Sequence, residues 1–126
     1  MKRYRGTCHC GHIEFQVDGD LQRVKICNCT ICTKKAYLHW VVPWAQFRLL
    51  TPVDGLATYC FNTGEAKHHF CPKCGVAPFH VPRGRPDCID VNVRCLEGVN
   101  HTRLTVEYFD GRHWEQSREE LHARRA

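Results

Sequence analysis

The stretch that decides the fold of this chain is Phe70-Cys71-Pro72-Lys73-Cys74-Gly75. Two cysteines at this spacing, followed by a glycine that can take a positive φ angle, are typical of a tight metal-binding turn. Much earlier in the chain, Cys8 and Cys10 form a second pair. The two pairs together supply four thiolates, a complete tetrahedral zinc site. We call Cys8, Cys10, Cys71 and Cys74 the four-cysteine cluster.

Cys8 and Cys10 are expected on a strand, because residues i and i+2 of a strand face the same side and both sulfurs then reach one metal. A zinc ion at the four-cysteine cluster would tie the N-terminal strand to the middle of the sheet. Since the ligands meet only in the folded chain, metal binding would contribute folding free energy directly. The alternative is a set of unrelated buried cysteines.

A second group of cysteines lies in Cys27-Asn28-Cys29-Thr30-Ile31-Cys32, which we interpret as a polar loop. We call Cys27, Cys29 and Cys32 the three-cysteine cluster. Three ligands with a vacant fourth position are the pattern of a reactive zinc site. The fourth ligand stays open: water, a substrate thiolate, a histidine, or one of Cys60, Cys88 and Cys95. Two alternatives are a second structural zinc and a loop that binds metal only with substrate.

Histidines precede the Cys71 turn. His68 and His69 point to opposite faces if their segment is extended. Either one is a candidate acid/base or ligand, since imidazole titrates near neutral pH, and His68 is the one we select. A solvated or packing role is the alternative. We interpret Cys60 and Cys88 as small buried hydrophobes and His39 with Trp40 as core or rim residues.

The chain has 126 residues, which fits one small domain, and ten of them are cysteines. No signal-peptide pattern is visible, and no apolar run approaches the roughly 20 residues of a membrane span. We therefore expect a cytoplasmic protein with no membrane partner. In a reducing cytosol, clustered cysteines favour metal binding over disulfides.

The net charge is +5, from 18 Lys and Arg against 13 Asp and Glu. This balance permits binding to nucleic acid or to acidic substrates. No basic stripe interleaved with aromatic residues is present, so the sequence does not favour nucleic acid as a partner. The basic residues that could hold the carboxylates of an acidic substrate are Lys34, Lys35, Arg83 and Arg85.

The hydrophobic pattern indicates strands almost throughout. Alternating or β-rich segments occur at residues 13–17, 37–42, 47–50, 56–61, 76–81, 89–93 and 104–108. Turn signals such as Asp54-Gly55 and Asp110-Gly111 separate several of them. Many short strands with regular turns predict an all-β fold of packed antiparallel sheets. Residues 115–125 are charged and are expected to form a short helix.

Four motifs in order resemble one known family. They are Gly6-Thr7-Cys8-His9-Cys10-Gly11, the segment Cys27-Asn28-Cys29-Thr30-Ile31-Cys32, the segment Phe70-Cys71-Pro72-Lys73-Cys74-Gly75, and Phe109-Asp110-Gly111-Arg112-His113-Trp114-Glu115. Together they are similar to the glutathione-dependent formaldehyde-activating enzyme family, which includes centromere protein V. The resemblance implies one zinc domain over residues 1–126, with a Mss4-like β-tent fold. It implies structural zinc at the four-cysteine cluster and a second zinc at the three-cysteine cluster.

The same resemblance implies an activity, that of S-(hydroxymethyl)glutathione synthase, a carbon–sulfur lyase. Its substrates would be glutathione and formaldehyde, with Cys27, Cys29 and Cys32 as catalytic residues around the second zinc. His68, which we select from the sequence itself, would be the catalytic residue that delivers the proton. Other segments, among them Asn92-Val93-Arg94-Cys95, look more like the centromere-protein-V branch. Two alternatives therefore stay open. One is a carbon–sulfur lyase acting on another thiol adduct, and the other is a non-catalytic zinc module that binds protein or nucleic acid.

Overall fold

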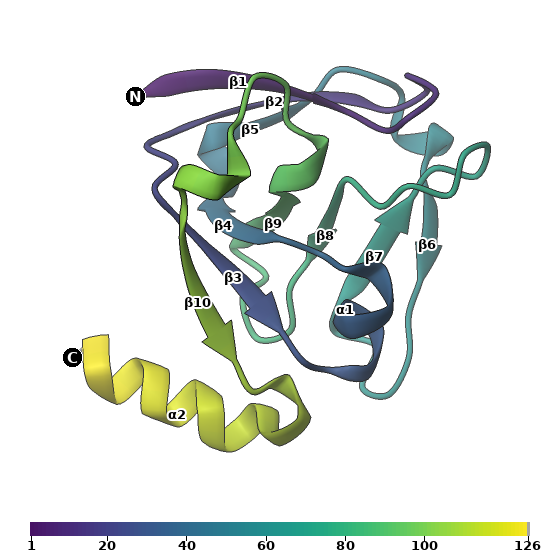
Figure 1. Cartoon of the computed structure of the whole chain (residues 1–126). Helices are drawn as coiled ribbons and strands as arrows, with labels where there is room; N and C mark the ends of the chain where they lie inside the picture. The colour runs from purple at the N-terminus through teal and green to yellow at the C-terminus, as the bar shows by residue number, and fades with distance from the viewer. Residues whose placement is uncertain (126) are drawn as a thin grey trace.

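The computed structural model describes the backbone of residues 1–125 and the side chains of residues 1–121. Its described residues form ten strands in two sheets (Figure 1). The strands are β1 (Lys2–Thr7), β2 (Glu14–Gly19), β3 (Arg23–Cys27), β4 (His39–Pro43), β5 (Phe47–Leu49), β6 (Ala57–Tyr59), β7 (Lys67–Phe70), β8 (Phe79–Val81), β9 (Cys88–Asn92) and β10 (Thr105–Phe109). The predicted all-β fold of packed sheets is thus confirmed.

The smaller sheet has the order β1-β2-β5, and the larger sheet has the order β10-β3-β4-β9-β8-β7-β6. Figure 1 shows the smaller sheet at one end of the molecule and helix α2 (Trp114–Arg125) at the other. The short helix α1 (Thr30–Lys35) follows β3. Short 3-10 helices span Trp44–Gln46, Val53–Gly55, Val93–Cys95, His101–Arg103 and Gly111–His113.

The core lies between the two sheets. The alternation at residues 13–17 buries Phe15 and Val17 of β2, as the pattern predicts. The Phe15 ring stacks on Phe47 of the smaller sheet at 5.4 Å between centroids and meets Phe79 of the larger sheet edge-on at 5.6 Å. All five residues of β9 are buried, because this strand is central in its sheet. These contacts hold the sheets face to face.

One strand pair departs from the predicted antiparallel arrangement. β10 runs parallel to β3, with Phe109 opposite Cys27, whereas every other strand pair described is antiparallel. The expected N-terminal strand is present as β1, but it ends at Thr7, before Cys8. Strands β3 and β7 were not predicted; β3 has only two apolar residues in alternation, and β7 is rich in histidine. The predicted helix at the C-terminal tail is confirmed as α2. Neither α-helix of the described chain has the length and apolar character needed to cross a bilayer.

A close contact in the core provides a test of the sheet packing. Gly6 lies opposite Phe15, and a Cβ atom at Gly6 would enter the Phe15 ring. We expect Gly6→Ala to lower the free energy of unfolding by about 1–3 kcal/mol through overpacking, measured by urea denaturation. The control is Arg3→Ala on the same strand, which removes an exposed ion pair with Asp18 and should leave the urea midpoint nearly unchanged, because solvent screens this pair. Equal urea midpoints for Gly6→Ala and the wild type would contradict the packing described.

Candidate metal centres and the adjoining pocket

The four-cysteine cluster brings its sulfurs together at one point. The sulfur atoms of its four cysteines all lie within 4.8 Å of one another. The Cys8 and Cys10 sulfurs are 3.8 Å apart, and those of Cys10 and Cys71 are 3.7 Å apart. Zinc–sulfur bonds of about 2.3 Å in a tetrahedron place neighbouring sulfurs about 3.8 Å apart. The geometry therefore fits a tetrahedral metal ion held by four thiolates.

The prediction that Cys8 and Cys10 lie on a strand is wrong. β1 ends at Thr7, and residues 8–13 form the loop of the β1–β2 hairpin. Gly11 has a φ angle of 82° and Gly75 one of 79°, so each cysteine pair is followed by a glycine in the left-handed region. The chain has to turn at Gly11 to return as β2, and this turn, rather than strand alternation, aims both sulfurs inward.

Backbone amides stabilise the sulfurs of this cluster. The amide of Ile13 donates to the Cys8 sulfur at 3.3 Å, and that of Cys74 donates to the Cys71 sulfur at 3.4 Å. Burial opposes ionisation of Cys74, but neighbouring amides and thiols lower its pKa to about 6. A thiolate is the form that binds metal, so the turns prepare the cluster for a cation.

The three-cysteine cluster spans a strand end and a helix start. Cys27 ends β3, Cys29 caps α1, and Cys32 lies buried inside α1. The amide of Cys32 donates to the Cys29 sulfur at 3.4 Å. The polar loop that we predicted is therefore partly helical. The helix was missed because its six residues, Thr-Ile-Cys-Thr-Lys-Lys, are too few to show apolar periodicity.

These three sulfurs also lie within 4.8 Å of one another. Hydrogen bonds from the Cys27 and Cys32 thiols lower the pKa of Cys29, whereas hydrogen bonds with Cys27 and Cys29 raise the pKa of Cys32. In the described part of the chain, no fourth cysteine or histidine joins this group. Its residues could hold a metal ion with a coordination position left for another ligand.

The turn after β10 fixes the three-cysteine cluster in place. Because β3 and β10 are parallel, their carboxyl ends lie side by side. Asn28 donates from Nδ2 to Asp110 Oδ1 at 3.0 Å, and Arg112 Nε donates to the Asn28 carbonyl at 2.8 Å. A Cβ atom at Gly111 would collide with the Cys27 sulfur and crowd Cys29. Sequence reasoning missed these supporting residues, although the Asp110-Gly111 turn lay within the family-like motif.

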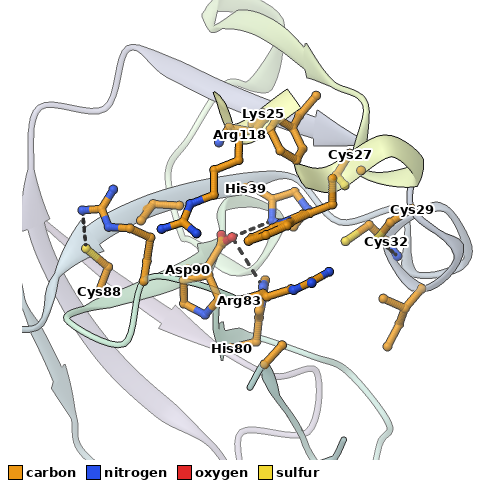
Figure 2. Close-up of a pocket in the computed structure, with 18 of the residues that line it drawn as sticks. Lys25, Cys27, Cys29, Cys32, His39, His80, Arg83, Cys88, Asp90 and Arg118 are labelled. Carbon is orange, nitrogen blue, oxygen red and sulfur yellow. Dashed lines mark hydrogen bonds and ion pairs between the residues drawn. The ribbon is translucent and has the colours of Figure 1, made fainter. Parts of the chain in front are cut away.

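A pocket of about 870 Å³ adjoins the three-cysteine cluster (Figure 2). Its walls include basic side chains from several elements, namely Arg23, Lys25, Arg83, Arg85, Arg112 and Arg118. Of the four residues that the sequence offered for binding carboxylates, Arg83 and Arg85 line the pocket, whereas Lys34 and Lys35 do not. Trp114 of α2 also contributes, and its ring lies 3.9 Å from the Arg83 guanidinium.

His68 lines this pocket, as a catalytic role requires, and is buried in β7. Its ring stacks on Phe61 at 5.5 Å and on His80 at 5.0 Å. Burial lowers the pKa of His68 to about 4, so the ring is neutral at pH 7. His69 faces elsewhere, with its Nδ1 2.8 Å from the Thr58 hydroxyl. The catalytic role of His68 stays a prediction.

The remaining cysteines have different surroundings. Cys88 is buried, as predicted, and its sulfur accepts a hydrogen bond from Arg85 Nη2 at 3.0 Å. Cys60 is exposed, so the prediction of a buried Cys60 is wrong. Its segment follows the edge strand β6, which has no strand paired on its outer side among the described residues. Burial raises the pKa of the half-buried Cys95 to about 12.

Packed β-sheets carrying two cysteine clusters that could hold metal define a class: a small β protein with a Mss4-like fold and two candidate metal centres. A family described as glutathione-dependent formaldehyde-activating enzyme matches residues 3–112, and the chain belongs to this family. A crystal structure of a Rhodobacter sphaeroides protein is also similar. It is 31% identical with a TM-score of 0.73, and the match covers 82% of this chain and 99% of that one.

The contact at Gly111 leads to a test of how the cluster is supported. We expect Gly111→Ala to displace Cys27 and so weaken metal binding at the three-cysteine cluster by ~10–100-fold, the cost of losing a supporting contact behind the ligands. Chelator competition on the zinc-loaded protein measures this, with the four-cysteine cluster as the internal reference. Gly55→Ala is the control, because its added Cβ meets only the His12 ring. Unchanged zinc release from Gly111→Ala would contradict the role given to this turn.

Proposed function

We propose that the protein is a zinc-dependent carbon–sulfur lyase that condenses glutathione with formaldehyde, as S-(hydroxymethyl)glutathione synthase does. Membership of the family supports a formaldehyde-activating function related to glutathione. The observation that carries the proposal is one pocket with the three-cysteine cluster in its wall and arginines around it. Its volume of about 870 Å³ lies within the usual range for small-molecule sites, about 300–1,000 Å³.

The reaction joins the glutathione sulfur to the formaldehyde carbon. The thiol loses its proton, the carbon–sulfur bond forms, and the carbonyl oxygen gains a proton to become the hydroxyl of the product. A zinc ion held by Cys27, Cys29 and Cys32 would lower the pKa of the added thiol and orient it. Orientation is the larger contribution, since three thiolate ligands leave the metal a modest Lewis acid.

The chain's own residues would position the substrate and move the proton. Arg83 is only 27% exposed, and its Nε has no hydrogen-bond partner in the part of the chain that the structure describes, so it can donate to a carboxylate of glutathione. The neutral ring of His68 would carry the proton to the product oxygen. The four-cysteine cluster would hold a structural zinc. All ten cysteines are free, which supports a reducing, cytoplasmic setting.

The activity is tested by exchange NMR on glutathione plus formaldehyde, with and without the protein, at matched thiol concentration. We expect the zinc-loaded protein to accelerate adduct formation and Cys29→Ser to lose both the acceleration and one zinc, with the fold intact. Cys60→Ser is the matched control, because Cys60 is exposed and outside both clusters. No acceleration from a protein with both clusters filled would overturn the glutathione reaction and point to another thiol substrate or a non-catalytic module.

The structural role of the four-cysteine cluster is tested separately. We expect Cys74→Ser to abolish cooperative unfolding or to aggregate, because structural zinc sites contribute ~10–16 kcal/mol of binding free energy that is also folding free energy. Thermal unfolding followed by circular dichroism measures this, with Cys95→Ser as a control outside the cluster. A soluble Cys74→Ser protein with a cooperative transition would contradict the assignment.

A further inference from the structure

Three buried polar residues meet on one face of the larger sheet. They come from adjacent strands: His39 from β4, Asp90 from β9 and His80 from β8. His80 lies directly opposite Asp90, and His39 lies two residues from Val41, the residue opposite Asp90. Residues at such positions share a face of the sheet. All three line the pocket described above (Figure 2).

The contacts within this group converge on a single oxygen. His39 Nδ1 lies 2.7 Å from Asp90 Oδ2, and His80 Nε2 lies 3.5 Å from the same atom. The side chains are only 6%, 8% and 6% exposed for His39, His80 and Asp90, respectively. The Tyr37 hydroxyl is not available to them, because it donates to the Asp90 backbone carbonyl at 2.8 Å.

Contacts within the group leave some of its hydrogen-bonding atoms without a partner. His39 Nε2, His80 Nδ1 and Asp90 Oδ1 are all buried, and none has a hydrogen-bond partner among the described residues. A buried polar atom without a partner costs about 1–3 kcal/mol, and native proteins keep few of them. Three such atoms in one group, all in the wall of a pocket, show that the surrounding sheet leaves this polar group incompletely paired.

The atoms that converge are His39 Nδ1, His80 Nε2 and Asp90 Oδ2, and their chemistry indicates which ligand they could bind. Each residue offers one nitrogen or oxygen, and these atoms lie within 4.8 Å of one another. Donors bound about 2.1 Å from one ion lie ~3–4 Å apart, which the 3.5 Å separation already matches. An imidazole binds metal through either nitrogen, with its proton on the other. The ion would replace the 2.7 Å hydrogen bond between His39 and Asp90.

We propose that His39, His80 and Asp90 form a third metal site, which binds a divalent first-row transition-metal ion. Two imidazole nitrogens and one carboxylate oxygen suit such ions, whereas magnesium and calcium take oxygen ligands. Three protein ligands leave further coordination positions facing the pocket. The site shares no residue with either cysteine cluster, so the proposal does not rest on the lyase function.

The probe is cobalt(II), added to protein whose two cysteine clusters are already filled with zinc. We expect one cobalt ion to bind with d–d absorption and without a sulfur-to-cobalt charge-transfer band, since no thiolate is among the ligands. Asp90→Asn and His39→Gln should each weaken cobalt binding by more than the ~10–100-fold that loss of a supporting residue costs. His69→Gln is the matched control, a half-buried histidine outside the group.

A second measurement does not depend on the folding of the variants. In the wild-type protein, bound cobalt should shift the ring NMR signals of His39 and His80 strongly and those of His69 only weakly. Binding of no third ion to the zinc-loaded wild type would show a hydrogen-bonded group only and overturn the proposal. Retention of the cobalt ion by both Asp90→Asn and His39→Gln, or ring signals at His39 and His80 that do not move, would overturn it equally.

Discussion

The meeting of four sulfurs from two different sheets is the constraint on which the rest of the structure depends. Cys8 and Cys10 lie in the hairpin loop of the smaller sheet, and Cys71 and Cys74 follow β7 of the larger sheet. Their separations fit a tetrahedral ion, so one point can join the two sheets at the edge of the Phe15 core. A chain this short buries a modest fraction of its surface, and such a link supplements the core.

With the sheets held together, the larger sheet arranges the pocket. Parallel pairing of β3 with β10 sets the three-cysteine cluster against the Asp110-Gly111 turn, which limits where Cys27 can lie. The central strands β4, β9 and β8 place His39, Asp90 and His80 in the same pocket wall. Cysteine thiols and a group of histidine and aspartate side chains therefore face one cavity, and its arginines favour an acidic ligand.

Much of the fold and of the candidate site could be predicted from local patterns. The alternation at residues 13–17 and 89–93 identified β2 and β9, because their apolar side chains face the core at every second position. Spacing grouped the cysteines as the structure does. Local patterns missed β3 and β7, two short strands that are held in place by their neighbours in the larger sheet.

The sequence by itself determined the all-β class, the family and the membership of both cysteine clusters, because each depends on residues that are close in the chain or on motifs in a recognisable order. Only the tertiary structure decided that Gly111 supports Cys27 and that His39, His80 and Asp90 meet. These contacts join residues far apart in the chain. Strand register and the parallel pairing of β3 with β10 create them, and no periodicity within a single segment records that pairing.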